Sequence, residues 1–257
     1  MTSHERADTP VAAEVVASPN HGERRNGRRP DMLLLHYTGM PRAEEALAWL
    51  CNPASGVSSH YFVFEDGRVT QLVPEARRAW HAGVGSWGGD HDINSCSIGV
   101  EIANPGHDGG LPPFPEAQIA GVIGLAKDIV ARWSIPPKRV LGHSDVAPGR
   151  KQDPGERFPW GELHRAGVGH WVEPAPIRNG QPLARGDRGA QVAAAQAMLA
   201  QYGYGVPQSG VFDDATEAVV AAFQRHFRPE RVDGVADASS LATLRDLLAA
   251  LPSSRLA

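Results

Sequence analysis

His143, Lys151 and Asp153 lie close together in residues 142–155, a segment with several Pro and Gly residues. That composition predicts a loop rather than a helix. A second histidine, His36, follows a short apolar run that is long enough for a buried strand. Two imidazoles and one carboxylate can bind a zinc ion and leave a fourth position open for water, as in catalytic zinc sites. If these side chains converge, the chain is a hydrolase.

The third ligand has two candidates at this stage. Asp153 comes directly before a Pro-Gly pair, where Asp is also common as an ordinary turn residue. Asp145 follows His143 by two positions and could either bind the metal or form a hydrogen bond within the loop. Spacing alone does not choose between the two carboxylates.

Two further charged residues could complete a hydrolytic site. Glu101 lies inside the apolar run 98–102, where a buried carboxylate is costly unless it has a partner. It could take a proton from water at the metal, or it could pair with an arginine. Lys151 could stabilise the negative oxygen that forms when water attacks a carbonyl, or it could simply be solvated.

Four other polar residues are weaker candidates for substrate contact. His81 lies in a glycine-containing loop where such contact is plausible, whereas His60 precedes a strand and could be packed in the core. The remaining two candidates are Asn94 and Asn104. Neither histidine is expected to bind the metal.

Alternating strand-like and helix-like segments should position these groups. Strands are expected at 32–37, 61–64, 69–72, 97–102 and 139–142, and helices at 43–50 and 115–133. An Asp-Gly turn predicts that the second and third strands form a hairpin. The pattern favours an α/β or α+β domain with one central sheet. His36 and His143 both end strand-like runs, and strand ends commonly present side chains into one cleft.

The C-terminal part is expected to be a small helical module. Helices are predicted at 189–202, 214–227 and 239–251, two of them preceded by similar glycine turns at 210–216 and 234–240. We divide the chain into a flexible lead (1–17), a catalytic domain (18–172), a linker (173–182) and the helical module (183–257). Because the module carries no proposed ligand, we expect a tether that concentrates polymeric substrate. Packing of its helices on the catalytic domain is the alternative.

Composition excludes several classes of protein. The net charge of −4 and the lack of a basic stripe argue against nucleic-acid binding. No apolar run has the length of a membrane helix, and the N-terminus has no signal-peptide pattern, which favours the cytoplasm, with the periplasm or cell envelope as the alternative. Cys51 and Cys96 are expected to be unpaired, and a monomer is favoured.

Six ordered segments resemble one family, the zinc-dependent N-acetylmuramoyl-L-alanine amidases of the amidase-2 type, which include the peptidoglycan recognition proteins. The segments are 18–20, 35–39, 59–63, 80–83, 98–102 and 142–155. Residues 183–251 resemble the three-helix peptidoglycan-binding domain that is often joined to such amidases. The loop 106–115 falls outside these motifs and could shape the substrate cleft.

The resemblance implies an α/β fold, with a central mixed sheet flanked by helices and a C-terminal three-helix domain. It implies one Zn²⁺ per chain, held by His36, His143 and Asp153, with Glu101 as the base and Lys151 as the oxyanion stabiliser. The substrate would be bacterial peptidoglycan or a muropeptide, cut between the lactyl group of N-acetylmuramic acid and L-Ala in cell-wall turnover. A non-catalytic recognition protein and a phage-type endolysin are the alternatives. The complete ligand set favours an enzyme.

Overall fold

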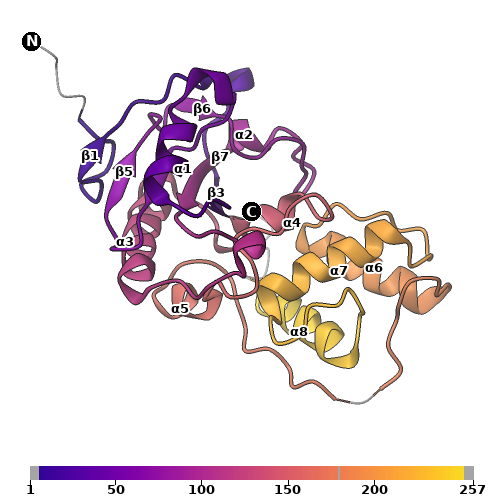
Figure 1. Cartoon of the computed structure of the whole chain (residues 1–257). Coiled ribbons are helices and arrows are strands. Elements are labelled where there is room, and N and C mark those ends of the chain that lie inside the picture. The colour runs from indigo at the N-terminus through magenta and orange to yellow at the C-terminus, as the bar shows by residue number, and fades with distance from the viewer. Residues whose placement is uncertain (1–5, 179, 252–257) are drawn as a thin grey trace, which may run out of the picture.

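The computed structural model describes residues 6–178 and 180–251, which form a sheet-containing lobe and a smaller helical lobe (Figure 1). Residues 1–5 of the expected N-terminal lead lie outside the described residues. The larger lobe contains a six-stranded mixed sheet. In sheet order its strands are β1 (Glu14–Val15), β5 (Val69–Gln71), β4 (Tyr61–Val63), β7 (Ser97–Ile102), β3 (Met32–Tyr37) and β8 (Val140–Gly142). A separate antiparallel pair joins β2 (His21–Glu23) and β6 (Arg77–Ala79).

Helices flank this sheet and make up the second lobe. Those of the sheet lobe are α1 (Ala43–Leu50), α2 (Ile93–Cys96), α3 (Glu116–Trp133), α4 (His143–Val146) and α5 (Trp160–Arg165). Those of the helical lobe are α6 (Ala190–Tyr202), α7 (Asp214–Phe227) and α8 (Ala238–Ala249). The predicted fold class is therefore confirmed. None of the helices in the described part of the chain is both long and apolar enough to cross a bilayer. Cys51 and Cys96 are unpaired, as expected.

Strand β3 lies between β7 and β8 and is parallel to both. Side chains alternate between the two faces of a strand. Leu33 and Leu35 accordingly pack in the hydrophobic cluster that includes α3, whereas Met32 and Leu34 pack in a different cluster. His36 follows the same alternation, so it lies on the face of Met32 and Leu34. We call this side of the sheet the His36 face.

The two faces of the sheet are covered by different elements. Helix α3 supplies Ile119, Val122 and Ile129 to the cluster on the face opposite His36. On the His36 face, α1 packs its Ala46 and Leu50 against strand β4 and its neighbours. The β3 and β8 end of the same face is covered by the helical lobe. The sheet is thus covered on both faces, and on the His36 face the covering element changes from α1 at β4 to the helical lobe at β3 and β8.

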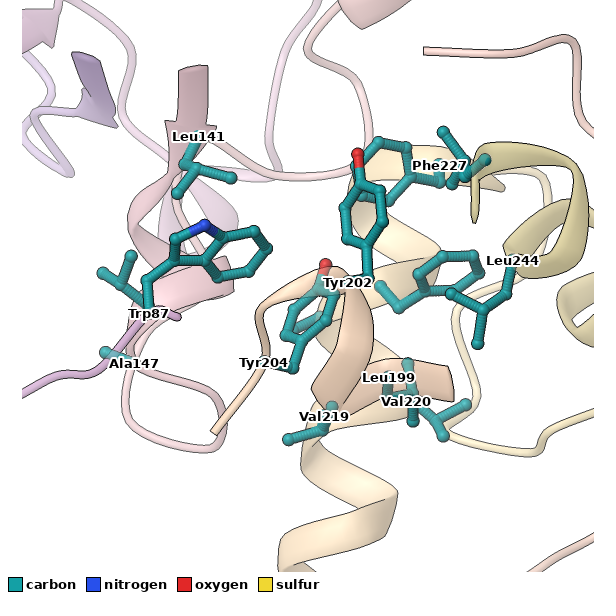
Figure 2. Packing of buried hydrophobic residues seen from close by; sticks show 14 of the residues in the cluster. Trp87, Leu141, Ala147, Leu199, Tyr202, Tyr204, Val219, Val220, Phe227 and Leu244 are labelled. Atoms are coloured by element: carbon teal, nitrogen blue, oxygen red, sulfur yellow. The ribbon is translucent and has the colours of Figure 1, made fainter. Parts of the chain in front are cut away.

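The helical lobe shares a hydrophobic core with the sheet lobe. Trp87 and Leu141 of the sheet lobe pack with Tyr202 and Tyr204 of the helical lobe (Figure 2). Trp87 is completely buried, and its ring meets that of Tyr204 edge to face with centroids 4.9 Å apart. Gly203 has a φ of +138°, and a Cβ there would lie 2.6 Å from the Trp87 ring, so a side chain would not fit.

This packing corrects the expectation of a tethered module. A tether requires two bodies that move independently, whereas these two lobes bury one another's aromatic side chains. The segment that joins them is also held, since Thr243 Oγ1 of α8 accepts a hydrogen bond from the backbone N–H of Ala175 at 3.0 Å. The sequence could not reveal the shared core, because the positions of Tyr202 and Phe227 are equally consistent with a core formed within the helical module alone.

The structure differs from the sequence-based expectation at several short elements. The turn of helix α4 forms where a loop was expected, because it ends before Pro148 and Asp145 caps it by accepting from the N–H of Gly142 at 2.8 Å. Helix α5 lies in a segment that shows no clear periodicity. Residues 14–15 of the expected flexible lead form an edge strand, and the N–H of Val16 donates to the carbonyl of Gln71 at 2.9 Å.

His60 is a completely buried core histidine that directly precedes β4. Its Nδ1 accepts a hydrogen bond from the N–H of Gly99 at 2.9 Å, and its Nε2 lies 3.1 Å from the carbonyl of Arg77. Burial, followed by the charge of the nearby Arg24, lowers the pKa of His60 to about 3. The ring therefore stays neutral in the folded protein at any pH near neutrality.

We expect Trp87→Ala to destabilise the whole protein by about 3–5 kcal/mol, the usual cost of removing a large buried aromatic side chain. Because the two lobes share a core, thermal unfolding followed by calorimetry should give one transition for the parent protein. Val84→Ala, at a side chain that is 85% exposed, is the control and should change little. Two well-separated transitions in the parent would contradict the shared core.

The stability of the metal-free protein should fall as the pH drops from about 6.5 towards 3, since the unfolded His60 ring binds a proton that the folded ring does not. One such group increases the slope of the unfolding free energy against pH by up to about 1.4 kcal/mol per pH unit. His60→Gln should therefore flatten that slope in urea titrations, whatever its effect at pH 7. The exposed His91→Gln is the control, and an unchanged slope in His60→Gln would refute the assignment.

Candidate active site

The site lies where strands β3, β7 and β8 end on the His36 face. His36 of β3 pairs in parallel register with Glu101 of β7, so both side chains point to the same side of the sheet. The neighbours of Glu101, Val100 and Ile102, pack on the opposite face with α3. His143 directly follows β8 and is the first residue of α4. The sheet thus delivers three of the predicted residues to one place.

Two imidazole nitrogens and one carboxylate oxygen converge there. Nδ1 of His36 lies 3.0 Å from Nδ1 of His143 and 2.9 Å from Oδ2 of Asp153. The same Oδ2 lies 3.0 Å from Nδ1 of His143. All three side chains are buried. Asp153 rather than Asp145 joins the two histidines, since the Asp145 carboxylate is turned towards the helical lobe.

The donor set fits a zinc ion. Three acceptor atoms this close repel one another unless a cation or a shared proton lies among them. Ligands bound tetrahedrally at about 2.0–2.1 Å lie about 3.3–3.4 Å apart, so only small adjustments are needed. The backbone carbonyl of Ala82 lies 2.8 Å from Nε2 of His143, and a proton held there leaves Nδ1 free as a ligand.

His81 orients His36 in the same way, through a contact with the ring nitrogen that does not face the proposed metal. Its Nδ1 lies 3.0 Å from Nε2 of His36, so a proton on that nitrogen directs the lone pair of Nδ1 towards His143. The ring of His81 occupies the space above Gly99, where a Cβ would lie 2.5 Å from it. His81 also lines the cleft, so the expected substrate contact stays a prediction.

Electrostatics keeps His36 and Asp153 deprotonated. Burial, followed by the charge of His143, lowers the pKa of His36 to about 4. Burial alone would raise the pKa of Asp153, but the charges and hydrogen bonds of His143 and His36 outweigh it and lower that pKa. Metal binding requires a neutral imidazole and an ionised carboxylate, and the shifts of His36 and Asp153 favour these forms at neutral pH.

Glu101 and Lys151 face the same cleft. Burial, followed by the charge of Asp153, raises the pKa of the Glu101 carboxyl well above its ordinary value, and Lys151 opposes that shift. Within the described residues Glu101 forms no ion pair, and its buried Oε2 has no hydrogen-bond partner. The arginine pair considered from the sequence is therefore absent from this part of the chain, and the carboxyl group is free to act on a substrate or water.

The cleft has a volume of about 480 Å³ and contains most of the predicted residues. Its wall includes His36, His81, Glu101, His143, Lys151 and Asp153. It also includes side chains that sequence reasoning did not assign, namely Tyr37, Trp49, His107, Asp108 and Arg150. Cavities of this size accommodate small molecules and short oligomers.

Three expected substrate contacts are corrected. His60 is buried beneath the cleft with its ring nitrogens occupied. The Asn94 side-chain oxygen accepts from the N–H groups of His81 and Ala82 at 3.0 and 2.8 Å, so it shapes the loop that carries His81. Asn104 donates to the carbonyl of Pro112 at 3.0 Å and is likewise buried. These side chains hold loops in place, and none lines the cleft.

The missed residues depend on contacts that are distant in the sequence. His107 lies between the hydroxyl of Tyr37 and the carboxylate of Glu156, with 3.0 Å to each. It belongs to the loop 106–115, which the sequence had marked only as a possible wall of the cleft. The guanidinium of Arg150 donates to the carbonyls of Ala82 and Val84 at 2.6 Å each. In the sequence, only the position of Arg150 next to Lys151 could have indicated that it lies at the site.

Comparison with known proteins agrees with this geometry. The family model for N-acetylmuramoyl-L-alanine amidase matches residues 26–156, and a model for a peptidoglycan binding domain matches residues 188–244. The N-acetylmuramoyl-L-alanine amidase AmiD of Escherichia coli strain K12 is 38% identical over 232 residues, which cover 86% of this chain and 83% of that protein. The 1,6-anhydro-N-acetylmuramyl-L-alanine amidase AmpD of Enterobacter cloacae is 33% identical over 60% of this chain and 89% of its own length.

Solved structures show the same likeness. A complex of the E. coli amidase AmiD with anhydro-N-acetylmuramic acid-L-Ala-D-γ-Glu-L-Lys has a TM-score of 0.72 and 37% identity, covering 88% of this chain and 91% of that one. AmpDh3 of Pseudomonas aeruginosa has a TM-score of 0.71 and 32% identity, covering 89% and 95%. This chain therefore belongs to the N-acetylmuramoyl-L-alanine amidase family.

Proposed function

We propose that the cleft hydrolyses the amide bond between the lactyl group of N-acetylmuramic acid and L-Ala of the stem peptide, with one Zn²⁺ held by His36, His143 and Asp153. The convergence of two Nδ1 atoms and one carboxylate oxygen within 3.0 Å carries this proposal. Zinc, when bound there, supplies a Lewis acid that polarises a carbonyl group and makes water a stronger nucleophile. Membership of the amidase family supports the choice of bond.

Glu101 is suited to move the protons of the reaction. Its raised pKa lets the carboxylate accept a proton from the attacking water and return it as a carboxylic acid to the departing amine. The C–N bond then breaks, leaving the lactyl carboxylate and the free amino group of L-Ala. The ammonium of Lys151, on the same cleft wall, would stabilise the negative charge on the former carbonyl oxygen.

The substrate is expected to be a muropeptide or a peptidoglycan strand. The solved structure of the AmiD relative holds an anhydromuramoyl peptide, and another structure of AmpDh3 holds an anhydromuramic pentapeptide. A cleft that is open to solvent and lined by Trp49 and Tyr37 provides aromatic surfaces for sugar rings and peptide. A non-catalytic recognition role is less well supported, because every proposed ligand is present and buried.

Removal of the metal should abolish hydrolysis of a soluble anhydromuramoyl tripeptide, and added zinc should restore it. His36→Ala, His143→Ala and Asp153→Ala should each lose bound zinc, since three protein ligands are the minimum for such a site. Metal content by atomic emission and product formation by mass spectrometry are the measurements. The exposed His91→Ala should keep one zinc per chain and full activity. Full activity of metal-free protein would end the proposal.

Glu101→Gln and Lys151→Ala should keep zinc but slow turnover by on the order of 10²-fold or more, as expected for a lost general base or oxyanion donor. Each has a matched control on the exposed side of α3, Glu116→Gln for the first and Lys127→Ala for the second. Steady-state kinetics on the same muropeptide, with zinc content measured in parallel, gives the result. A parental turnover rate in either variant would show that its residue has another role.

A further inference from the structure

Asp145 links the two lobes directly beside the proposed metal site. Its carboxylate is completely buried, two residues after His143. Oδ1 accepts a hydrogen bond from the hydroxyl of Tyr204 at 2.6 Å. Oδ2 accepts from the N–H of Gly142 at 2.8 Å and from Nδ1 of His226 at 2.7 Å. Two of its three partners therefore come from the helical lobe.

Those two partners are themselves fixed in place. Tyr204 lies just after α6 and packs its ring against Trp87, as Figure 2 shows. His226 lies in α7 and stacks on Trp160 of the sheet lobe, with ring centroids 3.7 Å apart and planes 19° apart. Both side chains are buried. A buried carboxylate is costly unless its oxygens are hydrogen-bonded, so Asp145 depends on both groups.

The Asp145 carboxylate fixes the backbone at the point where strand β8 turns into helix α4. By accepting from Gly142, the carboxylate sets the turn from β8 into α4, and His143 is the first residue after that turn. Metal sites tolerate ligand displacements of only about 0.2 Å, and loss of an outer partner of a ligand typically lowers metal affinity by about 10–100-fold. A small shift of the Gly142–His143 backbone would therefore displace Nδ1 of His143 and weaken metal binding.

We propose that the helical lobe is part of the support of the metal site. Tyr204 and His226 hold Asp145, Asp145 holds the β8–α4 turn, and the turn places His143 opposite His36. The helical lobe then has a role beyond attachment to polymeric substrate, because the catalytic lobe needs it for full metal affinity. The inference rests on the proposed zinc site. Tyr204, His226 and Asp145 are positioning residues, since none of them lines the cleft or belongs to the proposed ligand set.

The test is the zinc affinity of Tyr204→Phe, measured by competition with a chromophoric chelator. This change removes only the hydroxyl group that donates a hydrogen bond to Asp145. The matched control is Tyr202→Phe, which loses a hydroxyl in the same core, one that lies 2.8 Å from Nδ1 of His170 instead. We expect on the order of 10-fold weaker zinc binding in Tyr204→Phe and no change in Tyr202→Phe. Melting temperatures of the metal-free variants show whether their stabilities match.

A second pair of variants tests the other partner. Asn can place an amide N–H near the position of Nδ1 of His226, whereas Leu cannot donate. His226→Asn should therefore retain more zinc affinity than His226→Leu, although both lose the stacking on Trp160. A purely structural role would make the two variants alike in zinc affinity once their stabilities are compared.

His143→Ala separates the possible failures. If His143→Ala loses zinc while Tyr204→Phe binds it as tightly as Tyr202→Phe, the support by the helical lobe is refuted and the zinc site stands. If His143→Ala binds zinc like the parent, the zinc site itself is wrong, and the inference falls with it. We expect zinc affinity to fall in His143→Ala, Tyr204→Phe and His226→Leu, to fall less in His226→Asn, and to stay at the parental value in Tyr202→Phe.

Discussion

Three buried acceptor atoms, drawn together to about 3.0 Å, are the constraint around which this protein is organised. The Nδ1 atoms of His36 and His143 and Oδ2 of Asp153 repel one another when no cation or proton lies among them. The fold must hold them there nevertheless. It does so at the ends of two adjacent parallel strands, where His36 is the penultimate residue of β3 and His143 directly follows β8, and with second hydrogen-bond partners on both rings.

The surroundings of the site follow from that constraint. Glu101 reaches the cleft because β7 is paired in register with β3, and its Oε2 has no partner within the described residues. The carbonyl of Ala82 and the ring of His81 determine which nitrogen of each ligand histidine is free. The helical lobe closes the β3 and β8 end of the same face, where Trp87 and Tyr204 pack together. A lobe that packs so close to the proposed metal ligands is well placed to influence them.

Sequence reasoning reached the elements that have strong local signals. The apolar run of β3, the Asp-Gly turn between β4 and β5, and the helical periodicity of α3 and α7 all correspond to observed elements. The proposed metal ligands were chosen by residue type and by likeness to a family. Spacing alone did not decide between Asp145 and Asp153. Elements that depend on distant partners were missed. Strand β1 exists because it bonds to β5, and α4 exists because Asp145 caps it.

The same limit applies to the site residues. His60, Asn94 and Asn104 are polar residues in or beside the family motifs. The sequence could not show that their side chains form hydrogen bonds with backbone groups of the same lobe. His107 reaches Tyr37 and Glu156 only through the tertiary fold. The shared core of the two lobes was also hidden, because a buried aromatic residue has the same pattern whether it packs within its own lobe or against another.

X-ray absorption spectroscopy at the zinc edge tests the central claim most directly. For the protein loaded with one zinc per chain, the account predicts nitrogen and oxygen neighbours at about 2.0–2.1 Å, with outer-shell scattering from two imidazole rings. The other group in the described residues that could hold a metal ion, Asp31, Asp90 and Cys96, contains a thiol. A sulfur neighbour at about 2.3 Å, or scattering from fewer than two imidazoles, would contradict the account.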